Sequence, residues 1–409
     1  MPNITTNIDR LWKSLEDMAR VGATKAGGSC RVALTDEDKA GRDLFASWVR
    51  EAGCEMVVDE VGNMFARRAG QDTNAAPVMM GSHLDTQPTG GRFGGVFGVL
   101  AGLEVFRTLN DQQIQTRRPL ELAVWSNEEG ARFQPAMMGS GVFCGMLSRA
   151  IVDATTDEAG LSFGDELERI GYRGHVSAMP RSLHAYIEAH IEQGPILEVE
   201  GKTIGVVTGI QGIKWFKARI LGTNAHAGTT PMEVRRDPLI TASRLVDGIT
   251  RLTRAERPDA VATVGMFTVL PGSINVINQE VRFSLDLRCP DEMALEELST
   301  KIRQLCDETA QEAGVGLDLE EIWHAAPTVF AESVVTAVDS AAAMLGHSRR
   351  PIVSGAGHDA KHLAGICPTG MIFIPCRDGI SHNEAEAIEQ ADAGAGADVL
   401  LHAILELAG

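Results

Sequence analysis

Short apolar runs that end in histidines or carboxylates constrain the fold of this chain more than any other feature. Residues 76–86 (APVMMGSHLDT) and 120–130 (LELAVWSNEEG) each have the pattern of a buried strand followed by polar side chains. Residues 94–110, between them, have the pattern of a helix opened by glycines. This alternation of strand, helix and strand predicts an α/β domain with a largely parallel sheet, whose ligands gather at the carboxyl ends of the strands.

The pattern changes near residue 208 and returns near residue 327. Before the change, the spacing predicts a helix over 35–53 and a hairpin over 54–70. After it come half-exposed strands and amphipathic helices, expected at 213–223, 235–255, 260–270, 279–289 and 292–314. Two helices with about four such strands predict an α+β domain. The buried runs resume at 351–364 and 370–382, so we expect a discontinuous first domain, 1–208 with 327–409, and an inserted domain, 209–326.

Composition excludes several classes of protein. The 409 residues exceed the size of a single core, and 44% hydrophobic with 22% charged residues excludes a disordered chain. A net charge of −18 disfavours nucleic acid and anionic membranes as partners. No run has the length of a membrane span or a signal peptide, so we expect a cytoplasmic protein. The seven scattered cysteines, without CxxC spacing, are expected to be reduced and mostly buried.

Residues of the types that bind metals stand at the ends of the apolar runs. Imidazole with carboxylate is the ligand combination that suits zinc and related divalent ions. In the pair Glu128–Glu129, one carboxylate can bind metal while the other accepts a proton from the attacking water. Asp85 follows His83 by two residues, and we expect its carboxylate to orient that imidazole. The candidate ligands and base are His83, Glu128, Glu129, His190 and His382.

Several motifs together resemble the hydantoinase/carbamoylase amidohydrolases. These are a branch of the dinuclear zinc aminopeptidase-like superfamily that includes N-carbamoyl-L-amino acid hydrolases, β-ureidopropionases and allantoate amidohydrolases. The resemblance covers nearly the whole chain in order, through GSHLDTQPTGGRFGGVFGVLAGLEV, WSNEEGARF, HIEQGP, AHAGTTPM, SGAGHDA and GISH. It implies an α/β catalytic domain of zinc-aminopeptidase type with an inserted α+β dimerisation and lid domain, and a homodimer.

The resemblance also assigns roles to residues. It makes His83 and His190 ligands of one divalent metal, Glu129 and His382 ligands of a second, and Glu128 the general base. The two ions per subunit would be zinc, manganese, cobalt or nickel. Where the family has a bridging aspartate, this chain has Gly94. Glycine cannot bridge two dications, so occupancy of the second site is expected to be low. Two interpretations stay open: a natural variant with one metal or an unusual bridge, or a substitution that disables the enzyme.

A second set of residues is implied for the substrate. Arg288 is the expected partner of a substrate carboxylate, although a pair with Asp286 is the alternative. His226 is expected to stabilise the oxyanion, often from the partner subunit, although a turn-capping imidazole is the alternative. His358, Asp359 and His362 are expected near the metals without binding them. The implied substrate contacts are Gln193, Gln211, His226, Asn275, Arg288 and Gly357.

The sequence thus predicts a metal-dependent hydrolase of linear amides. Its expected reaction cleaves the C–N bond of an N-carbamoyl amino acid or related ureido acid to amino acid, ammonia and carbon dioxide, impaired here by Gly94. An aminoacylase or dipeptidase acting on an ordinary amide is one alternative. A binding protein that has lost catalysis is the other.

Overall fold

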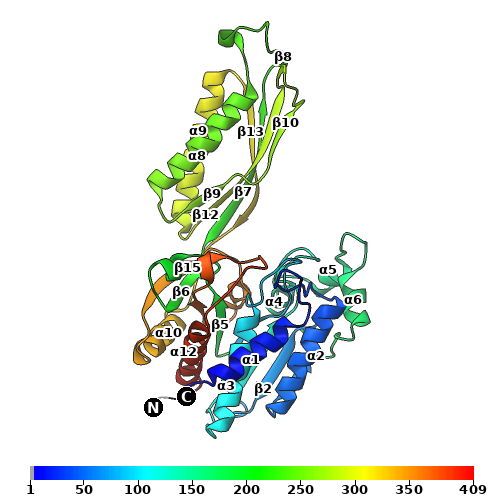
Figure 1. Ribbon diagram of the computed structural model, residues 1–409, viewed down its shortest axis with the longest axis vertical. Coiled ribbons are helices and arrows are strands. Elements are labelled where there is room, and N and C mark those ends of the chain that lie inside the picture. Colours follow the sequence, from blue (N-terminus) through cyan, green and yellow to red (C-terminus); the bar gives the residue numbers. More distant parts are fainter. Residues whose placement is uncertain (1–3) are drawn as a thin grey trace. The chain divides into compact units, whose positions relative to one another are not determined.

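The apolar runs at the two ends of the chain pair into one nine-stranded sheet in the computed structural model, which describes residues 4–409 (Figure 1). Its strand order is β1-β2-β4-β3-β5-β16-β6-β14, and β15 pairs with β6. The strands span Glu55–Val58 (β1), Met64–Arg68 (β2), Val78–His83 (β3), Leu120–Trp125 (β4), Ala185–Ile191 (β5), Ile204–Ile210 (β6), Thr328–Val329 (β14), Arg349–Ser354 (β15) and Thr369–Ile374 (β16).

The strands in the middle of this sheet pair in parallel. Strand β3 pairs in parallel with β4 and β5, and β16 pairs in parallel with β5. On one side of these strands, β2 of the β1–β2 hairpin pairs antiparallel with β4. On the other side, β6 pairs antiparallel with β16. The expectation of a largely parallel sheet therefore holds only for the central four strands, which are buried along their whole length.

Long helices cover this sheet and bury its core. Helices α3, α10 and α12 contact the central strands, and α1 packs on α3 and α12. The helix expected at 35–53 is α2, capped by the Thr35 hydroxyl. The helices are α1 (Ile8–Ala19), α2 (Asp36–Glu51), α3 (Val96–Asp111), α10 (Glu332–Met344) and α12 (Gln390–Ala408). Shorter helices are α4 (Met138–Phe143), α5 (Arg149–Ala154), α6 (Phe163–Arg169), α7 (Ile196–Val199), α11 (Ala360–Leu363) and the 3-10 turn η2 (Arg377–Gly379).

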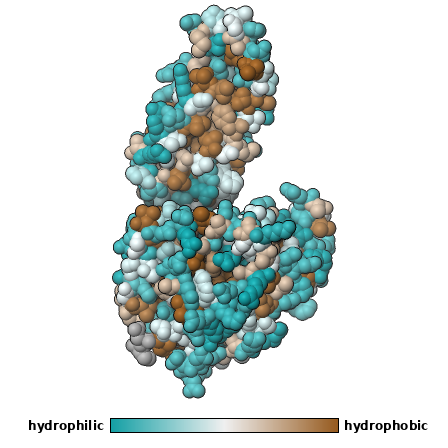
Figure 2. Space-filling model, viewed as in Figure 1, coloured by the Kyte–Doolittle hydropathy of each residue, from teal (hydrophilic) through white to brown (hydrophobic). Residues whose placement is uncertain are grey.

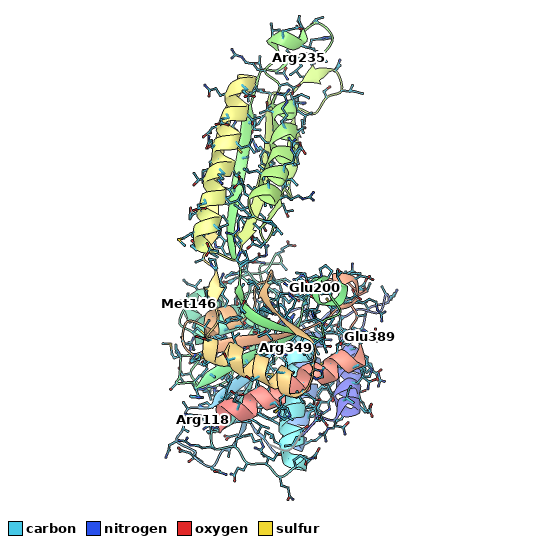
Figure 3. The ribbon with its side chains drawn as sticks, turned by 90° about the vertical axis from the view of Figure 1, so that its left-hand side faces the viewer. Arg118, Met146, Glu200, Arg235, Arg349 and Glu389 are labelled. Carbon is cyan, nitrogen blue, oxygen red and sulfur yellow. The ribbon has the colours of Figure 1, made fainter. Side chains whose placement is uncertain are left out.

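The chain divides into two units. The large unit comprises the residues up to Thr208 together with Val329–Gly409, and the inserted unit is Gly209–Thr328. In the inserted unit, helices α8 (Pro238–Glu256) and α9 (Glu292–Ala313) lie side by side on one face of a five-stranded antiparallel sheet (Figure 3). Its order is β10-β12-β7-β13, with β9 on β12. The strands are β7 (Gly212–Leu221), β9 (Val261–Thr263), β10 (Phe267–Leu270), β12 (Glu280–Cys289) and β13 (Gly316–Ala325), and β8 (Ala225–His226) pairs with β11 (Val276–Ile277).

Two details of the inserted unit differ from expectation. The strand expected at 260–270 is two strands, because Thr263 lies opposite Asp286 whereas Phe267 lies opposite Phe283, so one extra residue bulges out. Strand β13 was not anticipated: its sequence GLDLEEIWHA is acidic and largely exposed, as suits the edge of a sheet.

The seven cysteines all lie within the described residues. All seven cysteines are free, and six are buried. Among residues 4–409, no helix has both the length and the apolar character needed to cross a membrane.

Candidate active site

The central strands bring the predicted ligands to one edge of the sheet. His83 is the last residue of β3, His190 lies near the end of β5, and Glu128 follows β4 by three residues. Because β3, β4 and β5 are parallel neighbours, their carboxyl ends meet at that edge. His382 lies farther from its strand than expected, since η2 separates it from β16, and its backbone has a φ of 53°.

The predicted ligands form two pairs of imidazole and carboxylate. His83 Nε2 lies 3.4 Å from Glu128 Oε2, and His382 Nε2 lies 3.2 Å from Glu129 Oε2. The ring of His190 stacks on that of His83 with centroids 6.0 Å apart. His382 is half exposed, whereas the other three side chains of the two pairs are nearly buried. The arrangement gathers the five residues that the sequence singled out.

Backbone carbonyls set the tautomers of both buried histidines. His83 Nδ1 lies 2.9 Å from the carbonyl oxygen of Asp85, and His190 Nδ1 lies 2.8 Å from that of Ile191. We assign the proton of each ring to Nδ1, which leaves an unprotonated Nε2. Burial lowers the pKa of His83 to about 3 and that of His190 to about 4, so both are neutral near pH 7. A neutral imidazole oriented by a carbonyl is the form that binds divalent metals.

The carboxylate of Asp85 has a different role from the one expected. Its Oδ1 lies 3.8 Å from His83 Nδ1, and the carbonyl of the same residue makes the shorter contact. Its two oxygens instead accept hydrogen bonds from the backbone N–H groups of Glu128 at 3.2 Å and Glu129 at 3.1 Å. The physical reason is that β3 ends at His83, so the strand alternation on which the expectation rested does not reach Asp85. Asp85 thus holds the turn that carries both acids.

Burial makes this cluster of carboxyl groups hard to ionise. It raises the pKa of Glu129 to about 8 and that of Asp85 to about 7, and neighbouring carboxylates add to both shifts. The pKa of Glu128 is raised for the same reasons, with burial first and Asp359 next. A divalent cation offsets both desolvation and repulsion, so the donor set fits such an ion.

Position 94 has room for a side chain. A Cβ atom built there would lie 3.5 Å from Glu386 Oε2 and 3.9 Å from Glu386 Oε1, which is ordinary contact. The next residue has no such freedom: Gly95 has a φ of 66°, and its Cβ would lie 2.3 Å from His83 Nε2. The N–H of Gly95 also donates to His190 Nε2 at 2.9 Å.

Sequence reasoning missed two residues of the site. Gln87 donates from Nε2 to Glu129 Oε2 at 2.9 Å, and Glu386 accepts from the backbone N–H groups of Phe93 and Gly94. Both lie four residues from a predicted ligand, at the ends of the motifs around His83 and His382. Neither residue type is diagnostic alone, and the partners of Glu386 lie almost 300 residues away in the sequence, so no sequence pattern marked it.

Two other candidates of the large unit, Gln193 and His358, contact the proposed ligands. Gln193 donates from Nε2 to Ser381 Oγ at 3.1 Å, and the same Nε2 lies 3.4 Å from His382 Nε2. The ring of His358 packs against that of His190 at a tilt of 60°, with centroids 4.7 Å apart, and His358 Nε2 lies 3.0 Å from Ser354 Oγ. Asp359 is buried, His362 Nδ1 lies 2.9 Å from Ser140 Oγ, and Gly357 is exposed.

The remaining substrate candidates belong to the inserted unit. His226 accepts from the N–H groups of Gly228 and Thr229 at Nδ1, at 3.0 and 3.2 Å, which is the turn-capping contact considered as an alternative. Arg288 makes a two-point pair with Asp286, at 2.9 Å from Nε and 2.8 Å from the second nitrogen. Asn275 is exposed and its carbonyl accepts from Ala227 N. Gln211 is buried.

A further group of ligand-type residues lies outside this site. Glu292, Glu296 and His324 place one ligand atom each within 4.8 Å of one another. Lys214 pairs with Glu296 at 2.6 Å and His324 Nε2 lies 2.9 Å from Glu292, so both carboxylates already have partners and we assign no ligand to the group.

Comparisons with known proteins show what the chain resembles. Residues 79–406 match the model of peptidase family M20/M25/M40. An N-carbamoyl-L-amino-acid amidohydrolase of Rhizobium meliloti is 48% identical, over 99% of this chain and 98% of its own length. One of Geobacillus stearothermophilus is 39% identical over 98% of both chains. The crystal structure of an amidase of the hydantoinase/carbamoylase family from Burkholderia multivorans superposes with a TM-score of 0.97 and 52% identity, over 100% of this chain and 99% of the other.

Proposed function

The chain belongs to peptidase family M20/M25/M40 and is a hydrolase, and from that premise we propose that it cleaves the C–N bond of N-carbamoyl amino acids. Water adds to the ureido carbon, and the bond from that carbon to the nitrogen of the amino acid breaks. The carbamate released decomposes to ammonia and carbon dioxide. The names of the two amidohydrolases and the match over nearly their full length support this assignment.

One observation carries the chemical part of the proposal. The turn after β4 presents Glu128 and Glu129 to two different histidines, with both backbone N–H groups fixed by Asp85. One carboxylate can therefore accept and donate protons while the neighbouring carboxylate contacts a different histidine. We assign Glu128 as the general base that accepts a proton from the attacking water and passes it to the leaving nitrogen. Burial raises its pKa, which makes the carboxylate a stronger proton acceptor than an exposed one.

Divalent metal ions are the cofactors we propose. His83 and His190 would hold one ion, and Glu129 and His382 a second. When bound, such ions polarise the carbonyl group and acidify water. The protein residues orient these ligands, through the carbonyls of Asp85 and Ile191 and through Gln87 on Glu129.

The substrate contacts that the sequence implied are proposed for this chain residue by residue. Arg288 is the partner for the carboxylate of the substrate, which would share or replace its pair with Asp286. His226 is the proposed oxyanion donor. Because its Nδ1 accepts two backbone N–H groups, its Nε2 carries the proton in the neutral ring and can donate. The other proposed contacts are Gln193, Gln211, Asn275 and Gly357.

Gly94 favours one further candidate, a form that binds substrate but turns it over slowly. Without a carboxylate at this position, each metal keeps two protein ligands, whereas three are typical of catalytic zinc. None of the proposed substrate contacts depends on a side chain at position 94, so binding is expected to survive.

A substrate survey tests the proposal. The protein is assayed with N-carbamoyl amino acids, including N-carbamoyl-β-alanine, against N-acetyl amino acids and dipeptides, each with zinc, manganese, cobalt or nickel. Calorimetry measures binding of the same compounds. We expect preference for N-carbamoyl compounds in binding and, where it is detectable, in turnover. Preference for acetyl or peptide substrates would favour the aminoacylase or dipeptidase alternative instead.

Two copies of the chain are proposed to assemble through the inserted unit. The support is the exposed face of its five-stranded sheet, opposite α8 and α9, on which large apolar side chains remain uncovered within the unit.

A further inference from the structure

A single buried carboxylate joins two loops of the candidate site. Glu386 is 2% exposed, and its Oε1 accepts hydrogen bonds from Phe93 N at 2.9 Å and Gly94 N at 3.0 Å. Its Oε2 accepts from Ser381 Oγ at 3.0 Å. The first loop contains position 94 and leads into α3, and the second contains His382. Three donors on one desolvated carboxylate make this contact strong and its geometry well defined.

Glu386 packs so closely against Gly91 that no side chain fits at position 91. A Cβ atom built on Gly91 would lie 2.0 Å from Glu386 Cδ and 2.1 and 2.4 Å from its two oxygens. The carboxylate of Glu386 therefore occupies the space that a side chain at position 91 would need. The loop of residues 91–95 lies directly on Glu386, and its path depends on this residue.

The contact also extends toward Gln193. The Ser381 hydroxyl donates to Glu386, so its oxygen is left to accept, and Gln193 Nε2 donates to it at 3.1 Å. This fixes which end of the Gln193 amide faces Ser381. Gln193 Oε1 is buried and has no hydrogen-bond partner among residues 4–409. An acceptor held in this way, beside His382, suits an N–H group of a ligand.

We propose that Glu386 is a positioning residue that acts on both the metal ligands and the substrate contact. Through the loop of residues 91–95 it sets Gly95, whose N–H donates to His190 and whose backbone packs against the His83 ring. Through Ser381 it orients Gln193 so that Oε1 accepts an N–H of the ureido group. The second half rests on the proposed function, whereas the first concerns metal binding alone.

Four variants separate the two halves. Glu386→Ala removes all three contacts. Glu386→Gln keeps an oxygen for Phe93 N and Gly94 N, but its NH2 group now donates to Ser381 and competes with Gln193. Ser381→Ala removes only the second branch. Glu389→Gln is the matched control: Glu389 is an exposed carboxylate three residues away, paired with Arg377 and labelled in Figure 3.

Calorimetry of the metal-free proteins with Zn²⁺ gives the first readout. We expect Glu386→Ala to weaken zinc binding by about 10- to 100-fold, as loss of a contact that orients ligands typically does. Glu386→Gln, Ser381→Ala and Glu389→Gln should stay within about threefold of the parent on the same scale. Thermal unfolding by circular dichroism checks that each variant is folded. Unchanged zinc affinity in folded Glu386→Ala would overturn the proposal, and if that variant is unfolded, Gly91→Ala, which displaces the same carboxylate, takes its place.

Substrate binding gives the second readout, with the N-carbamoyl amino acid that binds best in the survey. Ser381→Ala and Glu386→Gln should both weaken its binding by about tenfold while zinc binding is retained, which a merely structural role would not produce. Equal substrate affinity in all variants would refute the Gln193 branch. If no N-carbamoyl amino acid binds the parent protein, the proposed function fails, and the zinc measurements still decide the role of Glu386.

Discussion

At the scale of single residues, position 94 decides how much of the expected chemistry this chain can perform. A Cβ there meets only Glu386, at 3.5 Å, so a side chain can begin at this position without displacing backbone. We expect Gly94→Asp to bind two metal ions tightly, where the parent holds the second weakly. Turnover of N-carbamoyl amino acids should rise by several orders of magnitude, because activation of water by a metal contributes several kcal/mol.

Metal analysis after dialysis and a turnover assay on both forms provide the measurement. Gly94→Ala is the control, since it adds the Cβ without the carboxylate. Two tightly held ions in the parent, or equal turnover in parent and Gly94→Asp, would show that the bridging role assigned to this position is wrong.

A second residue-scale prediction concerns pH. Burial raises the pKa of Asp59 to about 6, although Asn63 and Val61 donate hydrogen bonds to it. In the unfolded chain the value is near 3.8, so between about pH 4 and pH 6 the folded protein holds the extra proton. The stabilisation from this residue is therefore present at low pH and is lost as the pH rises through about 6.

The variant Asp59→Asn lacks this dependence. Relative to the parent, the variant should therefore lose about 2 kcal/mol more of its free energy of unfolding at pH 4.5 than at pH 7.5. Urea unfolding of parent and variant at both pH values measures the difference, and Asp247→Asn, at an exposed site on α8, is the control. A difference of the opposite sign would contradict the assigned direction of the pKa shift.

At the scale of structural elements, the turn after β4 depends on Asp85. Asparagine at this position keeps one oxygen, and its NH2 group faces a backbone N–H that it cannot accept from. Asp85→Asn should therefore loosen the turn that carries Glu128 and Glu129. We expect turnover and metal affinity to fall by about 10- to 100-fold, measured in the Gly94→Asp background where turnover is highest. Asp72→Asn, in an exposed loop, should change neither, and an unchanged Asp85→Asn would remove this role.

Sequence patterns predicted the elements that carry a strong period or a clear end. Thr35 with its acidic first turn marked the start of α2, and the run VMMGSH gave a strand that ends at its histidine. The bulge between β9 and β10 could not be foreseen, because it depends on which residues of β12 lie opposite. The edge strand β13 carries too many acidic residues to be distinguished from a loop. The hydrogen bonds from Glu128 N and Glu129 N to the Asp85 carboxylate could not be foreseen, because they depend on where β3 ends and how the turn after β4 folds.

In the candidate site, too, local sequence patterns could be interpreted but contacts between distant segments could not. The five metal-type residues were apparent in the sequence because each lies in or shortly after an apolar run. Glu386 was not apparent, since its partners Phe93 and Gly94 are almost 300 residues away and only the folded chain brings them together. Contacts between distant segments of this kind leave no periodic signal.

At the scale of the whole molecule, the open face of the inserted unit argues for a partner. Trp215 and Trp323 lie on this face with ring centroids 4.7 Å apart, and each is about two-fifths exposed. Met266 and Ile322 are also exposed and, with Trp215, line a hollow of about 790 Å³ over the sheet. Figure 2 shows hydrophobic residues gathered on this unit. Apolar surface of this kind on a folded protein typically marks an interface.

We therefore expect a homodimer in which this face, or the edge strand beside it, forms the same contact on both copies. Trp215→Asp places a charge at the centre of the face and should shift the protein toward monomer by at least tenfold in dissociation constant, because an unpaired buried charge is costly. Light scattering over a range of protein concentrations measures this shift. Ile151→Asp changes an exposed apolar residue of the large unit and should leave the mass unchanged. A stable monomer in the parent protein, or a dimer indifferent to Trp215→Asp but broken by Ile151→Asp, would place the interface elsewhere.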